Sequence, residues 1–126
     1  MGARRTVLII DDDPIVADAM VRSLRDLDVD VIKLDRGFGA LNLIAKHKPV
    51  LVVMDVMMPG LAGTDVTELL RSDPELAGTR VLLHSALDED VLAKRAAECG
   101  ADGYLLKTAG IAATHRKLAR WLDRGA

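Results

Sequence analysis

A chain of 126 residues, half of them hydrophobic, is long enough for one domain around one core. Aromatic residues make up only 2%, which predicts an aliphatic core and disfavours stacking platforms for single-stranded nucleic acid or flavin rings. The formal net charge of -2 indicates neither direct nucleic-acid binding nor attraction to a membrane surface. A single cysteine, Cys99, and the lack of an apolar run of membrane-spanning length predict a cytoplasmic protein without membrane insertion.

Short apolar runs bounded by turn residues predict five strands, over about residues 7–10, 29–34, 50–54, 80–86 and 103–107. Apolar residues at helical spacing predict a helix after each strand, over about residues 15–27, 40–45, 64–71, 88–99 and 111–122. Asp13 and Pro14 are suited to the start of the first helix, and Gly100 to the end of the fourth. Regular alternation of strand and helix predicts an α/β fold with a parallel sheet covered on both faces.

Carboxylates follow two of the predicted strands. The first strand runs into Asp11, Asp12 and Asp13, and the third ends at Asp55 before a Pro-Gly turn. Parallel strands that end at the same edge of a sheet bring such groups into one pocket, which is where open α/β sheets bind ligands. Clustered carboxylates repel one another unless they share protons or hold a cation, and a hard divalent cation is the simpler solution.

Four separated signals occur in a fixed order along the chain. They are the acids after the first strand, Asp55 in the segment MDVMMPG, Ser85 followed by alanine, and Lys107 with Tyr104 three residues before it. Each signal alone is weak, but all four at these spacings resemble the receiver domain of two-component response regulators. The resemblance extends over nearly the whole chain.

The resemblance implies a flavodoxin-like, doubly wound, five-stranded parallel sheet in the order 2-1-3-4-5, with five helices. The switch point of this order lies between the first and third strands, where the chain places Asp11, Asp12 and Asp55. On this interpretation residues 1–126 form a single receiver domain, with no output domain in this chain.

The resemblance also assigns roles to the acids. Asp55 matches the phospho-acceptor, whose carboxylate takes a phosphoryl group from a histidine of a partner kinase. Asp11 and Asp12 match the pair that holds Mg²⁺ together with Asp55 and the backbone carbonyl of Met57. Asp13 has two interpretations, and helix capping is favoured over a part in the metal site.

The remaining matches concern the phosphoryl group itself. Lys107 matches the lysine that pairs with the acceptor carboxylate and then with the phosphoryl oxygens, and Ser85 matches the hydroxyl that moves toward them. Tyr104 matches the aromatic switch residue that reports this movement. One departure stands out, because the lysine of the family is commonly followed by a cis proline and here by Thr108. A non-proline cis bond costs about 3 kcal/mol, so we expect a trans bond.

A receiver is a signalling switch that catalyses only its own phosphorylation and dephosphorylation, so no enzyme acting on a separate substrate is expected. Its implied partners are a sensor histidine kinase or histidine phosphotransfer protein and a downstream target protein. A weak homodimer through the fourth helix, fifth strand and fifth helix is left open. Two alternatives also remain, a receiver fragment of a longer regulator and a binding module that works without phosphorylation.

Two other families are weaker matches. Asp11 and Asp13 after a strand resemble the nucleophile motif of haloacid dehalogenase-type phosphatases, but Pro14-Ile15 replaces the expected Gly-Thr or Gly-Val. The identity of the phosphorylated aspartate, Asp11 or Asp55, distinguishes that class. A flavin- or nucleotide-binding module of the same topology needs a phosphate-cradling loop after the first strand, and three aspartates there would repel a phosphate.

Overall fold

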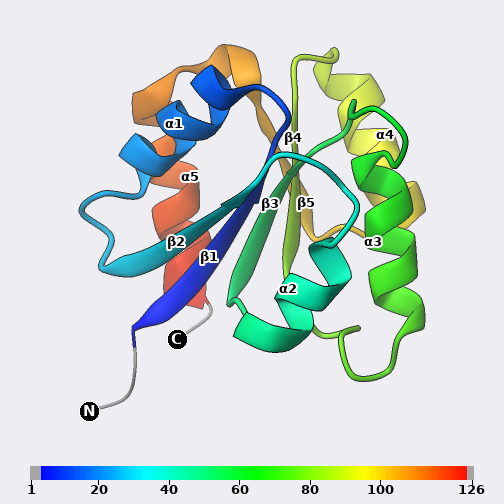
Figure 1. Ribbon diagram of the computed structural model, residues 1–126. Coiled ribbons are helices and arrows are strands. Elements are labelled where there is room, and N and C mark those ends of the chain that lie inside the picture. Colours follow the sequence, from blue (N-terminus) through cyan, green and yellow to red (C-terminus); the bar gives the residue numbers. More distant parts are fainter. Residues whose placement is uncertain (1–3, 125–126) are drawn as a thin grey trace.

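Five parallel strands form the centre of the structure, in the order β2-β1-β3-β4-β5 (Figure 1). They are β1 (Arg5–Ile10), β2 (Val29–Leu34), β3 (Leu51–Asp55), β4 (Val81–Ser85) and β5 (Gly103–Leu106). The computed structural model describes residues 4–124. The strand order confirms the flavodoxin-like topology that the resemblance implied.

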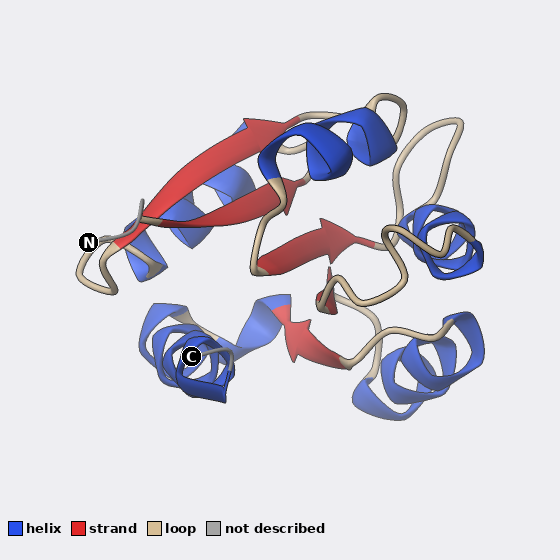
Figure 2. Cartoon of the chain, turned by 90° about the horizontal axis from the view of Figure 1, so that it is seen from below, coloured by secondary structure: helices blue, strands red, loops and turns tan. Residues whose placement is uncertain are grey.

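The helices lie in two layers, with α1 and α5 on one face of the sheet and α2, α3 and α4 on the other (Figures 1 and 2). Their bounds are α1 (Pro14–Ser23), α2 (Ala40–His47), α3 (Gly63–Ser72), α4 (Glu89–Cys99) and α5 (Ile111–Arg124). A short 3₁₀ helix, η1 (Lys107–Ala109), joins β5 to α5. None of the helices in residues 4–124 has the length and apolar character needed to cross a membrane.

The strand β3 is buried along its whole length because both of its faces are covered. Leu51 and Val53 pack in the core beneath α1 and α5, whereas Val52 and Met54 pack in the core beneath α2, α3 and α4. This alternation explains the uninterrupted apolar run in the sequence, since neither set of side chains meets solvent. It also places Asp55, buried, at the carboxyl end of the strand.

The start of α1 agrees with the sequence prediction, but its end does not. Asp13 caps the helix, because its Oδ1 accepts a hydrogen bond from Ile15 N at 2.9 Å. The prediction that the helix continues to Leu27 is wrong, since α1 ends at Ser23. Leu24 and Leu27 pack against the same core from the turns that follow. The apolar spacing therefore identified buried residues rather than the limit of the helix.

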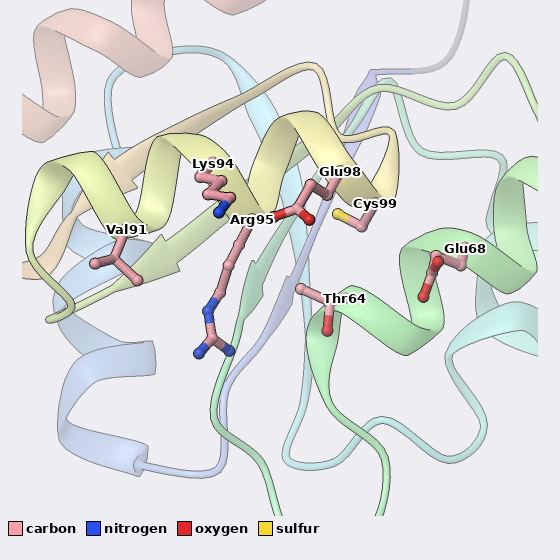
Figure 3. Close-up of a pocket in the computed structure, with 7 residues that line it drawn as sticks. All are labelled: Thr64, Glu68, Val91, Lys94, Arg95, Glu98 and Cys99. Carbon is pink, nitrogen blue, oxygen red and sulfur yellow. The ribbon is translucent and has the colours of Figure 1, made fainter.

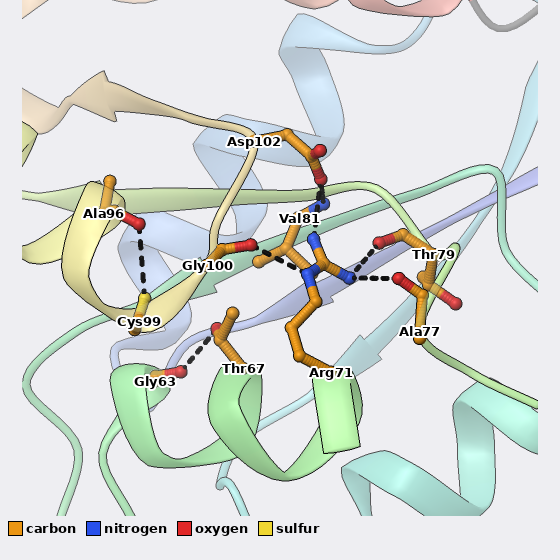
Figure 4. Close-up of polar contacts among 10 residues, drawn as sticks. All are labelled: Gly63, Thr67, Arg71, Ala77, Thr79, Val81, Ala96, Cys99, Gly100 and Asp102. Atoms are coloured by element: carbon orange, nitrogen blue, oxygen red, sulfur yellow. Dashed lines mark hydrogen bonds and ion pairs between the residues drawn. The ribbon is translucent and has the colours of Figure 1, made fainter. Parts of the chain in front are cut away.

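A polar network ties together the opposite end of the sheet, where the amino ends of β4 and β5 lie. Arg71, in the last turn of α3, donates hydrogen bonds to the carbonyl oxygens of Ala77 at 3.0 Å, Thr79 at 2.6 Å and Gly100 at 2.7 Å (Figure 4). Its guanidinium also pairs with Asp102 Oδ2 at 2.8 Å. We call Arg71, Asp102 and these three carbonyls the Arg71 clamp.

Asp102 contributes a second bond to this network. The same Oδ2 atom accepts a hydrogen bond from Val81 N at 2.8 Å, so it fixes the first residue of β4 (Figure 4). Gly100, at the end of α4, has a left-handed backbone with φ +88°, as expected for the predicted helix cap. The clamp thus joins α3, the loop before β4 and the end of α4 through hydrogen bonds that pair the donors of Arg71 with the acceptors around it.

Candidate functional site

Three carboxylates meet at the carboxyl ends of β1 and β3. Asp11 follows β1, Asp12 comes next, and Asp55 ends β3, and one oxygen of each lies within 4.8 Å of the others. Asp11 is 3% exposed and Asp55 is 4% exposed, whereas Asp12 is open to solvent. The predicted acidic pocket is therefore formed, with two buried acids and one at its entrance.

Lys107 closes the buried side of this pocket. Its Nζ lies 3.0 Å from Asp11 Oδ2 and 3.3 Å from Asp55 Oδ1. Apart from this ion pair, Asp11 Oδ2 is a buried atom that receives no hydrogen bond from residues 4–124. Lys107 thus contacts both acids, and its nearer partner is Asp11 rather than the Asp55 that the resemblance suggested.

The backbone around the acids holds their orientation. Asp11 Oδ1 accepts a hydrogen bond from Asp13 N at 2.9 Å, and Asp55 Oδ1 accepts one from Met57 N at 3.3 Å. The first residue of α3, Gly63, lies so close to the backbone oxygen of Asp55 that a Cβ atom there would collide with it. A glycine is therefore required at this position for α3 to pack against the end of β3.

Charge and burial oppose each other in the pocket. Burial raises the pKa of Asp55, the negative charge of Asp11 raises it further, and Lys107 only partly offsets them. Burial alone would lower the pKa of Lys107, but its contacts with Asp11 and Asp55 outweigh burial and raise it. The pocket thus holds a firmly charged lysine against two acids whose mutual repulsion it does not remove.

Ser85 lies at the end of β4, with its side chain buried. Its Oγ accepts a hydrogen bond from Leu87 N at 3.1 Å, and no hydrogen bond in residues 4–124 joins it to the acidic cluster. Ser85 therefore stands beside the pocket with its oxygen held by its own loop.

The peptide bond after Lys107 is trans, as expected, since residues 4–124 contain no cis bond.

Tyr104 points toward the surface between α4 and α5. Its hydroxyl donates a hydrogen bond to Glu89 Oε2 at 2.9 Å, and this contact raises the pKa of the phenol. The ammonium of Lys117 lies 5.9 Å from the centre of the ring. The sequence interpretation missed Glu89, for which an acid in the first turn of α4 indicated only a favourable helix dipole.

A larger hollow, of about 540 Å³, lies between α3 and α4 (Figure 3). Glu68, Lys94, Arg95 and Glu98 line it, and all four are exposed to solvent. Its one buried thiol, Cys99, donates to the carbonyl of Ala96 in its own helix. The hollow therefore lacks the cluster of buried, converging charged groups that the acidic pocket has, and the acidic pocket remains the site.

Most of the chain resembles known signalling proteins. Residues 7–119 match the family model described as response regulator receiver domain. The chain is 34% identical over 104 residues to the DNA-binding response regulator MtrA of Mycolicibacterium smegmatis, which covers 82% of this chain and 44% of MtrA. It is 38% identical over 109 residues to the response regulator GacA of Pseudomonas viridiflava, which covers 84% of this chain and 50% of GacA.

A solved structure gives the same result at the level of the fold. The signal receiver domain of NarL from Mycobacterium tuberculosis superimposes with a TM-score of 0.83 at 36% identity, and 98% of each chain is covered. This chain spans about half the length of the curated relatives it matches. With its strand order, its acidic cluster and these matches, the chain belongs to the response regulator receiver domains, the switches of two-component signalling.

Proposed function

We propose that Asp55 accepts a phosphoryl group from the phosphohistidine of a sensor histidine kinase or histidine phosphotransfer protein. The observation that carries this proposal is the burial of Asp55 beside Asp11, with Lys107 Nζ 3.3 Å from Asp55 Oδ1. A carboxylate whose negative charge is poorly compensated is stabilised when a cation and an electrophile approach it together.

In the proposed step, an Asp55 oxygen attacks phosphorus and forms a phosphorus–oxygen bond. The phosphorus–nitrogen bond breaks, and the imidazole of the donor, protonated on its other nitrogen, leaves as a neutral ring. Lys107 stabilises the negative charge on the phosphoryl oxygens, because its ammonium already lies beside the attacking carboxylate. The domain thereby catalyses its own phosphorylation, and water attack on the acyl phosphate reverses it.

The donor set fits Mg²⁺. Asp11, Asp12 and Asp55 supply carboxylate oxygens within 4.8 Å of one another, and Asp11 Oδ2 has spare capacity because it receives no hydrogen bond from residues 4–124. We propose that these acids and the Met57 carbonyl hold the ion. When bound, Mg²⁺ offsets the repulsion between the carboxylates and the anionic phosphoryl group.

The proposed readout is a change in the surface around Tyr104. Ser85 would exchange the hydrogen bond from Leu87 N for contact with the phosphoryl group, and the loop between β4 and α4 would follow it. That loop leads into Glu89, which holds the Tyr104 hydroxyl at 2.9 Å, so the movement would release the ring. The phosphoryl group acts by favouring one of two arrangements.

The proposed reader is a downstream protein or another domain of a longer regulator, since the matched relatives are about twice as long as this chain. As predicted from the single cysteine, we place the exchange in the cytoplasm. Residues 1–126 act as one receiver unit in this scheme. A binding module that works without phosphorylation is the alternative, and the acceptor test separates the two.

The test is the intact mass of the protein after incubation with acetyl phosphate and Mg²⁺. One added phosphoryl group is expected, and it should be absent in Asp55→Asn and after chelation of the metal. Asp102→Asn is the matched control, because it makes the same change at the other end of the sheet and should leave phosphorylation intact. Phosphorylation that persists in Asp55→Asn would overturn the assignment. If the protein also stays unphosphorylated when a purified phosphodonor protein is added, the result would favour a binding module that works without phosphorylation.

A further inference from the structure

A small, mostly apolar pocket of about 170 Å³ opens between α1 and α5. Its walls are aliphatic side chains of α1 and the first turn of α5, and its floor is the end of β4. The lining residues are Ile15, Val16, Ala19, Met20, Ser23, His84, Lys107, Gly110, Ile111 and Thr114. The phosphorylation chemistry proposed above uses only Lys107 among them, so the pocket is a separate feature.

His84 is the one buried polar side chain of this pocket without a partner. It is 7% exposed, and within residues 4–124 no protein group bonds to its ring nitrogens, which are not wholly buried and so remain open to a molecule in the pocket. Burial and the nearby charge of Lys107 lower the pKa of His84 to about 4, so the ring is neutral at neutral pH. A neutral imidazole offers one acceptor and one donor, and both are unused here.

The other polar groups in the lining are already engaged. Ser23 Oγ donates to Ala19 O at 3.1 Å, and Thr114 Oγ1 donates to Gly110 O at 2.8 Å, each within or beside its own helix. The ammonium of Lys107 is held by the two buried acids. A molecule entering the pocket would therefore find apolar walls and a single polar ring, His84, that no protein group engages.

We infer that this pocket is a binding site for a small neutral molecule that carries one aromatic ring and one hydrogen-bond donor, which His84 accepts. The size follows from comparison, because an apolar cavity of about 150 Å³ in another protein holds benzene. The neutrality follows from the walls, which cannot compensate a charge taken out of water, and from Lys107, which would repel a cation. The donor follows from the free imidazole lone pair.

Phenol is the probe, and anisole is its matched control because it keeps the ring and lacks the O–H donor. The readout is the chemical shift of the His84 ring nitrogens, measured by NMR on the ¹⁵N-labelled protein during titration. We expect a saturable shift for phenol with a Kd on the order of 1 mM, and binding about fivefold weaker for anisole. In His84→Leu the titration is followed instead by the backbone amide shifts of lining residues such as Ala19 and Thr114, and phenol and anisole should bind with equal affinity.

Two alanine substitutions test the location. Ala19→Phe places a ring in the pocket from α1 and should abolish phenol binding, whereas Ala97→Phe on the exposed face of α4 should leave it unchanged. Circular dichroism checks that each variant is folded, and the comparison of phenol with anisole on the unaltered chain needs no variant. No saturable shift at roughly 20 mM phenol, or equal affinity for anisole, would overturn the inference.

Discussion

The two ends of the sheet treat their charged side chains in opposite ways. At the amino ends of β4 and β5, Arg71 donates to three carbonyls and to Asp102, and Asp102 Oδ2 accepts from two donors. At the carboxyl ends of β1 and β3, Asp11 and Asp55 share the ammonium of Lys107, and Asp11 Oδ2 receives no hydrogen bond from residues 4–124. One end is a satisfied network and the other retains unused acceptors.

This difference teaches where stability and function come from in the fold. An arginine bonded on every side holds loops and helix ends in place, because removing it leaves several backbone carbonyls without their donor. Carboxylates that lack compensation raise the energy of the resting protein, but they leave room for a cation and a phosphoryl group. The sheet separates the two tasks by about the length of a strand.

The largest effect on stability is expected from removing Arg71, the centre of the hydrogen-bonded network. Arg71→Met removes four hydrogen bonds and leaves three carbonyls and Asp102 without their donor. We expect a loss of about 4 kcal/mol in the free energy of unfolding, measured with urea, mostly from the three carbonyls, because the solvent-screened ion pair with Asp102 contributes little. Arg95→Met, on the exposed side of α4, is the control and should change stability by less than about 0.5 kcal/mol. An equal loss in both variants would show that the Arg71 clamp contributes nothing to the free energy of unfolding.

The second prediction concerns the stability cost of burying the ring of His84 near the site. The pKa of His84 is lowered from 6.5 to about 4, so the folded state resists its protonation more than the unfolded state does. The stability that this difference contributes is present above pH 6.5 and is lost as the pH falls toward 4. Between pH 7 and pH 4 the wild type should lose about 3 kcal/mol more than His84→Leu. Urea unfolding of both proteins at the two pH values measures this, and parallel pH curves would contradict it.

A third effect concerns the site itself. Lys107→Met removes the ammonium that lies 3.0 Å from Asp11 and 3.3 Å from Asp55. The rate of phosphorylation by acetyl phosphate with Mg²⁺ should fall about 100-fold, as expected when one electrostatic contact to the developing charge is lost. Lys94→Met, an exposed lysine of α4, is the matched control and should phosphorylate at the wild-type rate. A fall of less than threefold in Lys107→Met would mean that the lysine has only a structural role.

Sequence reasoning was reliable where the cause is local. The strand 29–34, the capping of α1 by Asp13 and the left-handed Gly100 were all predicted, because each depends on residues that are neighbours in the chain. The acidic cluster was also predicted, since parallel strands must end at the same edge. The assignment of Asp55 as acceptor stays a prediction until the mass measurement is made.

What the sequence could not predict is which distant groups become partners. An arginine in the last turn of α3 is suited to the helix dipole, and nothing in its neighbourhood indicates that it will bond Gly100 and Asp102 from the other side of a loop. The contact of Tyr104 with Glu89 is of the same kind. Both depend on how α4 packs against the sheet, which spacing along the chain does not determine.

The comparison of the two ends reduces to one paired measurement, the free energy of unfolding of Asp55→Asn and Asp102→Asn in urea at pH 7 without divalent cations. Both variants replace an aspartate with an asparagine, so a difference in their stability reflects the surroundings of the two side chains. Because burial and Asp11 raise the pKa of Asp55, its charge costs stability at pH 7, and Asp55→Asn should be more stable than the wild type. Asp102→Asn should be about 1 kcal/mol less stable, because it loses the ion pair with Arg71. A loss of stability in Asp55→Asn as large as that in Asp102→Asn would contradict the account.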